Sequence, residues 1–250
     1  MVYTIAVAGK GGVGKTTVAA LLVQQLLKID RPVLAVDADP NSNFNLLLGL
    51  DYAETVSDIR EEARNLSSAS LSKSDFFSMR LEEAITEGNG VDLLVMGRPE
   101  GTGCYCAVNN ILREHLSKLS KNYKFVVIDN EAGMEHLSRR TAGHIDILLL
   151  VSDSTKVGIQ AAINTFNTAK KADLQVKSVS LVINKSRKEL GNDQINSLEK
   201  AGLTVAGYVP YSEGIEKNSE KGSRLEINLV QGEILNKVVQ GFVMDKVREA

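Results

Sequence analysis

The chain has 250 residues, 43% of them hydrophobic, so it is long enough to bury a sizeable core in one domain. Its 29 basic and 31 acidic residues leave a formal charge of −2, which provides no basic excess for binding nucleic acid. The N-terminus does not have the pattern of a signal peptide, and the longest apolar run, residues 145–151, is far shorter than the ~20 residues that span a bilayer. We therefore expect a cytoplasmic protein that binds neither nucleic acid nor membranes.

Apolar segments alternate with amphipathic segments along the chain. The strand candidates are residues 3–8, 32–37, 91–97, 124–129, 146–152, 178–184 and 203–209, and the main helix candidates are residues 15–28, 109–121 and 156–171. Most of the strand candidates are apolar throughout, which is typical of strands buried on both faces of a parallel sheet. This order predicts one α/β domain over residues 1–250, with a doubly wound, mainly parallel sheet flanked by helices. Ligands of such a sheet bind at the carboxyl ends of its strands.

The segment GKGGVGKTT, residues 9–17, directly follows the first expected strand. Gly9, Gly14, Lys15 and Thr16 fit the phosphate-loop pattern G-x-x-x-x-G-K-[ST]. Glycines in this motif let backbone N–H groups surround phosphate oxygens at the positive end of the following helix. Lys15 is expected to reach the β- and γ-phosphates, and the Thr16 hydroxyl to ligate Mg²⁺. The nucleotide-binding residues predicted here are Gly9, Gly11, Gly12, Val13, Gly14, Lys15, Thr16 and Thr17.

A second lysine, Lys10, follows the first glycine of the loop. With this lysine the loop resembles the deviant Walker A signature of the ATPase family that includes the MinD, ParA, arsenite-pump and nitrogenase iron-protein ATPases. The resemblance implies that Lys10 reaches across a homodimer to the nucleotide of the partner subunit, where a cation stabilises charge on the transferring phosphoryl group. It also implies that ATP binding and dimer closure are coupled.

The second expected strand ends in the segment VDADPNSN, residues 36–43, which contains Asp37 and Asp39. The same resemblance assigns Asp39 to the first nucleotide switch, where it positions the attacking water and so joins Lys10 and Lys15 as a catalytic residue. Asp37 lies at the end of the strand and is expected to help hold the Mg²⁺ shell.

Residues 51–90 are the least regular part of the sequence. Their centre, RNLSSASLSKSD, is rich in serine and in charged residues. Such a composition is typical of a surface excursion or a lid. We expect this segment to belong to the single domain and not to link two domains.

The two cysteines of the chain, Cys104 and Cys106, lie in the segment GTGCYCAVNN, residues 101–110. A disulfide between them would close a very tight and strained loop, and a reducing cytoplasm opposes it. A buried pair of inert thiols is a second interpretation. The third is half of a metal site, because a closed thiolate site needs four ligands and a two-fold dimer supplies the other two. We favour the third interpretation, with Ni²⁺ or Zn²⁺ as the metal.

The expected strand at 124–129 leads into DNEAGMEH, residues 129–136. Asp129 takes the Walker B position and is expected to hold Mg²⁺ through water. Gly133 is expected to be the glycine of the second switch, whose N–H senses the γ-phosphate. His136 and its acidic neighbours are interpreted either as a solvated switch helix or as residues that transmit the nucleotide state to the cysteine site.

The nucleotide base is expected to bind near VINKSR, residues 182–187. This segment looks like the guanine-reading motif N-K-x-D, but Arg187 occupies its last position and has no acceptor for guanine. Asn184 can still pair its amide with the N6/N7 edge of adenine, so ATP is favoured. The segment VPYSEGIEKN, residues 209–218, follows the last expected strand and is expected to close over the adenine through backbone groups, with Pro210 among the nucleotide-binding residues.

Together, GTGCYCAVNN and DNEAGMEHLSRR are similar to segments of the carbon monoxide dehydrogenase accessory ATPases, the CooC-type nickel-insertion proteins. This resemblance covers nearly the whole chain. It implies an ATP- and metal-dependent homodimer that assists nickel insertion into a client metalloenzyme, carbon monoxide dehydrogenase. Two alternatives stay open: a MinD- or ParA-type positioning ATPase with incidental cysteines, and an ATPase that transfers electrons through a bridging iron–sulfur cluster. The nitrogenase iron protein has its second cluster cysteine where this chain has His136.

Overall fold

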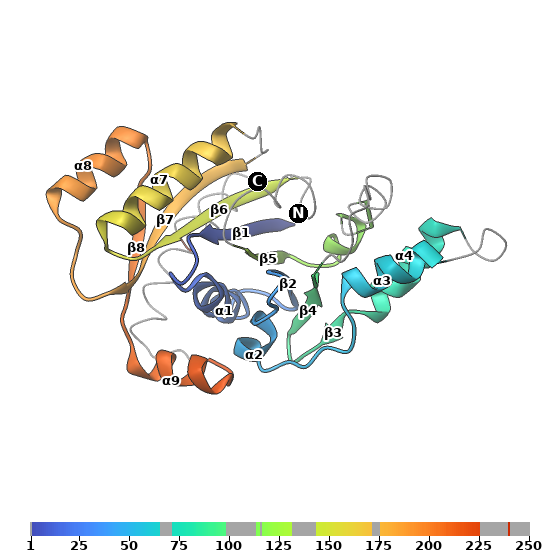
Figure 1. The fold of residues 1–250 in the computed structure, drawn as a ribbon. Helices are drawn as coiled ribbons and strands as arrows, with labels where there is room; N and C mark the ends of the chain where they lie inside the picture. Colours follow the sequence, from blue (N-terminus) through green and yellow to red (C-terminus); the bar gives the residue numbers. More distant parts are fainter. Residues whose placement is uncertain are drawn as a thin grey trace.

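A computed structural model describes residues 2–65, 72–98, 114–115, 117–131, 144–171, 176–225 and 240. Its centre is an eight-stranded sheet with the order β3-β4-β2-β5-β1-β6-β7-β8 (Figure 1). Every neighbouring pair is parallel except β3 and β4. The predicted doubly wound, mainly parallel α/β sheet is therefore confirmed.

The strands match the apolar segments of the sequence closely. Their bounds are β1 Tyr3–Gly9, β2 Val33–Ala38, β3 Thr86–Glu87, β4 Val91–Val95, β5 Phe125–Asn130, β6 Ile145–Ser152, β7 Val176–Ser186 and β8 Val205–Pro210. All residues of β5 and β6 are buried. That burial explains why these segments show no alternation of polar and apolar residues. The short antiparallel edge strand β3 is an element that the sequence did not predict.

One face of the sheet is covered by α1 (Lys15–Leu26) and α2 (Phe44–Leu48). Residues of α1 such as Val18 and Leu22 are fully or almost fully buried against side chains from β1, β2 and β5. Leu225 belongs to the same core, and Ile215 of α9 (Glu213–Lys221) packs against it, so the end of the described chain also lies on this face (Figure 1). Helix α1 thus holds the phosphate loop rigidly against the sheet.

The opposite face carries two separate helix pairs. Helices α7 (Lys156–Lys171) and α8 (Asn192–Ala201) cover β6 and β7 through residues such as Phe166 and Leu198. Helices α3 (Val56–Asn65) and α4 (Lys73–Glu83) cover β2, β4 and β5. Helices on both faces leave the strand ends as the accessible parts of the sheet, which is where ligands bind in this architecture.

Residues 51–90 are more regular than their serine-rich sequence indicates. Helices α3 and α4 both lie in this segment, and residues 66–71 between them are outside the described ranges. Val56, Ile59 and Ala63 recur at helical spacing and are buried, and Phe77 of α4 is buried beside them. The Ser72 hydroxyl caps α4 by accepting from the Asp75 N–H at 3.1 Å. A few apolar residues at helical spacing therefore stabilise helices in this segment despite its polar composition.

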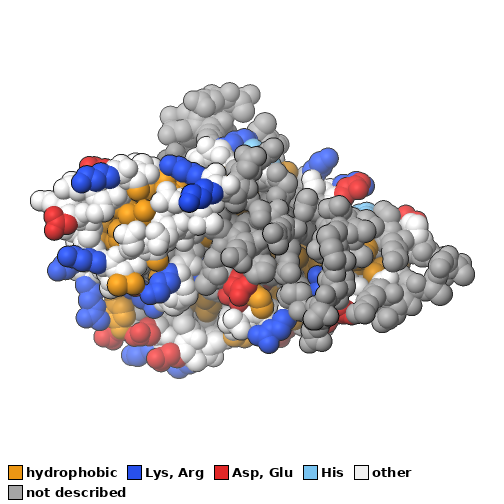
Figure 2. All heavy atoms as spheres, turned by 45° about the horizontal axis from the view of Figure 1, so that its top comes forward, with side chains coloured by type: hydrophobic (Ala, Val, Ile, Leu, Met, Phe, Trp, Pro, Cys, Tyr) orange, Lys and Arg blue, Asp and Glu red, His pale blue; other side chains and the backbone are white. Residues whose placement is uncertain are grey.

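No helix in the described residues is both long and apolar enough to cross a membrane. On the face shown in Figure 2, the described Lys and Arg side chains are interspersed with Asp and Glu side chains. This mixed surface agrees with the near-neutral composition of the chain.

Candidate functional site

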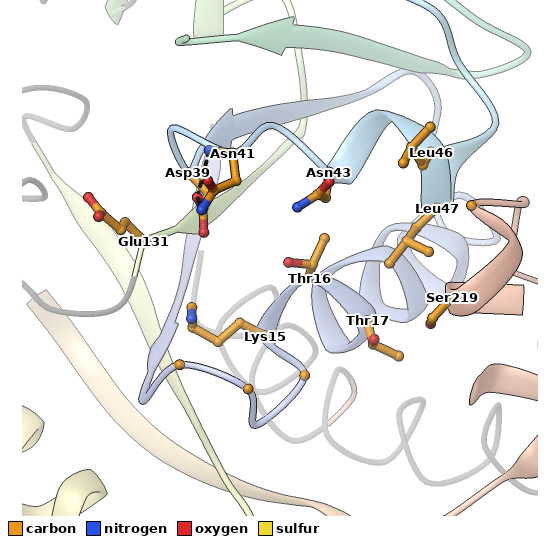
Figure 3. A pocket seen from close by; sticks show the side chains of 14 residues that line it. Lys15, Thr16, Thr17, Asp39, Asn41, Asn43, Leu46, Leu47, Glu131 and Ser219 are labelled. Atoms are coloured by element: carbon orange, nitrogen blue, oxygen red, sulfur yellow. Dashed lines mark hydrogen bonds between the residues drawn. The ribbon is translucent and has the colours of Figure 1, made fainter. Parts of the chain in front are cut away.

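A cavity of about 600 Å³ lies at the carboxyl ends of the central strands. The phosphate loop lines one wall, and the 38–43 loop with Leu46 and Leu47 of α2 lines the wall across from it (Figure 3). Helix α9 closes a third side through Ser219 and Gly222. The predicted residues that line the cavity are Gly11, Gly12, Gly14, Lys15, Thr16, Thr17 and Asp39.

The phosphate loop is held in its curved shape by glycine at Gly14. This residue is the N-cap of α1 and has φ +88°, in the left-handed region that favours glycine. A Cβ there would also collide with the side-chain amide nitrogen of Asn184. The first backbone N–H groups of α1 consequently have no side-chain cap and are available to an anion in the cavity.

Strand β7 buttresses the outer side of the loop. The buried Asn184 donates from Nδ2 to the carbonyl of Val13 at 2.9 Å. Lys185 donates from Nζ to the carbonyl of Gly12 at 3.2 Å, with its backbone at φ +53°. Two consecutive side chains of β7 thus fix two consecutive carbonyls of the loop. These contacts give Asn184 a role in shaping the loop that the sequence did not predict.

The 38–44 loop is organised by Asp37, which is fully buried at the end of β2. Its Oδ1 accepts from the Asp39 N–H at 3.1 Å and its Oδ2 from the Phe44 N–H at 3.0 Å. Burial raises the pKa of Asp37 to about 6, against the lowering effect of these two hydrogen bonds. Asp39 in turn accepts at Oδ1 from the N–H and the side-chain amide of Asn41, at 2.9 and 3.0 Å. Asp37 therefore supports the position of Asp39.

Asp129 lies beside Asp37, because β5 and β2 pair with these two residues in register. It is 1% exposed, and neither carboxylate oxygen makes a hydrogen bond of good geometry with the described residues, although the Thr16 hydroxyl lies close enough to act on it. Burial raises the pKa of Asp129 to about 7, while the Thr16 hydroxyl and the Lys15 charge act to lower it. A buried carboxylate without a partner is costly in a folded chain. Its oxygen donors, next to those of Thr16, suit a hard cation such as Mg²⁺.

A smaller cavity of about 150 Å³ adjoins the first and shares Gly14, Thr17 and Ser219 with it. It lies between the end of β7 and the start of α9. Two predicted base-site residues, Asn184 and Pro210, line it. The structure therefore brings both of them to one place, next to the phosphate loop.

Other predicted site residues lie elsewhere. Gly9 and Val13 belong to the loop but do not line either cavity, and the Lys10 side chain is exposed. Asp37 and Asp129 are buried behind the first cavity. The second-switch residue Gly133 and the two cysteines, Cys104 and Cys106, lie outside the described residues.

Several lining residues were missed by the sequence analysis. Asn41 and Asn43 complete the wall around Asp39 (Figure 3). Glu131, one of the acidic neighbours of the second switch, follows β5 and lines the same cavity. In the smaller cavity the side chains of Tyr211 and Glu216 were missed, although their segment was expected to contribute backbone groups. The polar run after Asp39 was a signal that could have identified the asparagines. Nothing in the sequence of α9 distinguishes its cavity-lining residues from solvated ones.

Comparison with known proteins places these features in a family. Residues 4–225 match the CobQ/CobB/MinD/ParA nucleotide-binding domain. The chain is 43% identical over 223 residues to an uncharacterized ATP-binding protein of Methanocaldococcus jannaschii, with 87% of this chain and 88% of that protein covered. It is 30% identical over 233 residues to the carbon monoxide dehydrogenase accessory protein CooC of Rhodospirillum rubrum, with 87% of each covered.

Among solved structures, the septum site-determining protein MinD of Pyrococcus horikoshii, in complex with Mg-ADP, superposes with a TM-score of 0.72. It is 22% identical and covers 100% of this chain and 99% of its own. MinD from the MinC:MinD complex of Aquifex aeolicus gives 0.71 at 19% identity, with 99% and 96% covered. These two similarities establish the fold.

Proposed function

The chain belongs to the CobQ/CobB/MinD/ParA family of nucleotide-binding domains, and we propose that it is an Mg²⁺-dependent ATPase that works as a homodimer. One observation carries this proposal. A complete phosphate loop faces a cavity of about 600 Å³, directly above a buried carboxylate, Asp129, that lacks a partner within the described chain. The ATP-binding relative at 43% identity supports the choice of nucleotide.

Each residue of the proposed site has a distinct part in hydrolysis. Lys15 and the loop N–H groups hold the β- and γ-phosphates, and Asp39 orients the attacking water. Thr16 and Asp129, with Asp37 behind them, hold the Mg²⁺ shell. When bound, Mg²⁺ neutralises negative charge on the phosphate oxygens. Lys10 is exposed, so it is free to reach the nucleotide of a facing subunit.

The proposed client is a metalloenzyme, with carbon monoxide dehydrogenase as the specific candidate. Two observations support this: the R. rubrum relative is a carbon monoxide dehydrogenase accessory protein, and the chain places its two cysteines in one Cys-x-Cys step. Cys104 and Cys106 of two subunits supply four thiolates, which suit Ni²⁺ or Zn²⁺ as cargo. ATP-dependent closure of the dimer then changes the geometry of these thiolates and with it the affinity for the metal.

The metal half of the proposal is tested by metal analysis of the reduced dimer. We expect one Ni²⁺ or Zn²⁺ per dimer in the wild type, and none in Cys104→Ser or Cys106→Ser. Tyr105→Phe is the matched control, because it changes the residue between the thiols and leaves both in place. Wild-type metal content in both serine variants would overturn the thiolate site and favour a positioning ATPase with incidental cysteines.

The dimer half is tested by Lys10→Ala. This variant should still bind Mg-ATP, because Lys10 lines neither cavity of its own subunit. Its rate of ATP hydrolysis should fall on the order of 100-fold, since the ammonium group from the partner subunit no longer stabilises charge on the transferring phosphoryl group. The exposed Lys121, far along the chain, gives the control variant Lys121→Ala. Hydrolysis that is unchanged in Lys10→Ala and independent of protein concentration would contradict the coupling.

A further inference from the structure

The smaller cavity beside the phosphate loop is lined by polar side chains that have no part in the proposed hydrolysis. Besides Asn184 and Pro210, it is lined by Tyr211 and Glu216, which come from the turn into α9 and from its first turns. The inference that follows rests on the proposed function, because it concerns how this cavity selects the base of the nucleotide.

Asn184 offers the cavity an acceptor. Its partner, the carbonyl of Val13, cannot donate, so the atom that contacts it must be the amide nitrogen. This contact uses one of the two amide hydrogens, and Oδ1 of the same amide can only accept. Asn184 is 4% exposed, so its orientation is fixed by the packing around it.

Glu216 adds a second acceptor. The Tyr211 hydroxyl donates its only proton to Oε2 of Glu216 at 2.5 Å. Since the Tyr211 hydroxyl donates its hydrogen to the Glu216 carboxylate, neither side chain presents a hydrogen-bond donor to the cavity. The carboxylate keeps free lone pairs after this contact, because an ionised carboxylate accepts about four hydrogen bonds.

Arg187 fixes the tyrosine. Its guanidinium lies 4.7 Å from the centre of the Tyr211 ring, and the Tyr211 N–H donates to the Ser186 carbonyl at 3.0 Å. Arg187 occupies the position where the N-K-x-D pattern has the guanine-reading aspartate. The side chain that replaces the guanine reader thus orients a different carboxylate, on another element of the fold.

We propose that Glu216, held by Tyr211 and Arg187, selects adenine over guanine by accepting from the exocyclic N6 amino group and by repelling the guanine O6. At position 6 of the purine ring, adenine has an amino group that donates and guanine has a carbonyl oxygen that accepts. An acceptor that meets another acceptor loses its solvation without gaining a hydrogen bond. Because Glu216 is exposed, we expect a preference of only about tenfold from this residue, not the larger factors of a fully buried reader.

The test measures binding of ADP, GDP and IDP to the full-length protein by calorimetry with Mg²⁺ present. In Glu216→Gln the ratio of the Kd values for GDP and ADP should fall about tenfold, since the new amide can donate to O6. Glu220→Gln is the matched control: it removes the same charge from the same helix at a residue that lines neither cavity, and its ratio should equal that of the wild type. Equal ratios in wild type and Glu216→Gln would overturn the proposal.

IDP locates the discrimination on the base, because hypoxanthine has the O6 of guanine without its 2-amino group. The wild type should bind IDP as weakly as GDP. Wild-type IDP binding as tight as ADP binding would place the discrimination at the 2-amino group and overturn the role of Glu216.

Tyr211→Phe separates orientation from packing. The ring and its contact with Arg187 stay, while the hydroxyl that holds Glu216 is lost. We expect the GDP/ADP ratio to fall severalfold, with the Kd for pyrophosphate unchanged. An equal loss of affinity for ADP, GDP and pyrophosphate would show that Tyr211 supports only the structure of the site. A wild type that binds no nucleoside diphosphate would instead remove the proposed ATPase function itself, so the two failures are distinguishable.

Discussion

Two aspartates in the same sheet are equally buried but differ in their hydrogen-bond partners and in the direction of their pKa shifts. Asp129 near the carboxyl end of β5 is 1% exposed, and Asp146 near the amino end of β6 is 2% exposed, with only β1 between their strands. Asp146 accepts from the Lys177 ammonium at 2.5 Å and from the Thr4 N–H at 2.9 Å. Asp129 has no hydrogen-bond partner among the described residues.

Their pKa values move in opposite directions for this reason. Burial alone acts to raise the pKa of both carboxyls. At Asp146 the hydrogen bond to Lys177, the Thr4 amide and the nearby His144 outweigh burial and hold the pKa below its usual range. At Asp129 burial dominates and raises the pKa to about 7. The chain therefore satisfies the buried charge of Asp146, whereas it leaves Asp129, where we propose that a cation binds, without a hydrogen-bond partner among the described residues.

The largest effect expected from this comparison is the loss of catalysis in Asp129→Asn. Replacing the carboxylate by an amide removes the charge that we propose helps to hold Mg²⁺, so Mg²⁺-dependent ATP hydrolysis should fall by at least about 100-fold. The measurement is steady-state phosphate release at saturating Mg-ATP. Without nucleotide and Mg²⁺, the variant should unfold at no lower urea concentration than the wild type, because the wild-type carboxylate is unpaired.

The pH dependence of stability sharpens this prediction. The folded pKa of Asp129 lies above the unfolded value of 3.8, so its contribution to stability is present below pH 3.8 and is lost as the pH rises toward 7. Wild-type protein without nucleotide should lose stability over that window, and Asp129→Asn should show a smaller loss, because Asp37, whose pKa burial raises to about 6, still contributes. A variant that is destabilised at pH 8 would mean that Asp129 is paired in solution.

Asp146→Asn should show the reverse combination. It removes a buried carboxylate that accepts from the partly exposed Lys177 ammonium and from the Thr4 N–H, and should lower the free energy of unfolding by about 2 kcal/mol at pH 7, with ATP hydrolysis per folded molecule unchanged. The folded pKa of Asp146 lies below 3.8, so this stabilisation is complete above pH 3.8 and is lost as the pH falls through the folded value. Urea denaturation at pH 7 and at pH 3 checks both statements. A difference between wild type and variant that persists at the lower pH would contradict the assigned cause.

Asp37→Asn is an intermediate case, because two backbone amides already satisfy this buried carboxylate. The asparagine has a single oxygen, so the N–H of Asp39 or of Phe44 loses its acceptor. We expect a loss of about 1 kcal/mol, smaller than at Asp146 because the variant also removes a buried charge. Faster hydrogen exchange over residues 39–44, with unchanged exchange in β6, is the observation that checks it. Uniformly faster exchange would indicate general destabilisation instead.

The smallest effect is expected at Asp30, whose carboxylate pairs with Lys124 at 3.1 Å on the surface. Lys124 and the adjacent Arg31 N–H lower the pKa of Asp30 without burial. Asp30→Asn should leave the urea midpoint unchanged within error at physiological salt, because solvent and ions screen such a pair. A shift as large as that of Asp146→Asn would show that burial is not what separates the two carboxylates.

The sequence predicted the aspartates of the site better than the walls around them. Asp39 lines the cavity and Asp129 lies near the end of β5, where the apolar strands and the fixed spacing of the phosphate loop led us to expect them, while their roles stay predictions. Only backbone groups were predicted from the segment of Tyr211 and Glu216, because the relevance of these two side chains depends on β8 and α9 folding back beside β7. The contact between Asn184 and Val13 spans 171 positions, and no local pattern encodes such a distance.

In residues 51–90 the sequence pattern indicated less regular structure than the fold contains. Their average composition indicated an irregular excursion, but burial of Ile59 and Phe77 against the sheet makes most of the described part helical. Composition averages over a segment, whereas packing depends on a few positions that share one helical face.

By itself, the amino-acid sequence determined the parallel α/β sheet, the phosphate loop and the nucleotide-binding family, because each depends on residue types at short, fixed spacings. Only the tertiary structure decided which buried carboxylate is paired and which is not. Asp129 and Asp146 both follow the same local rule of an acidic residue in an apolar strand. Their difference comes from Lys177 and Thr4 on neighbouring strands, and partners brought together by the sheet leave no mark in either local sequence.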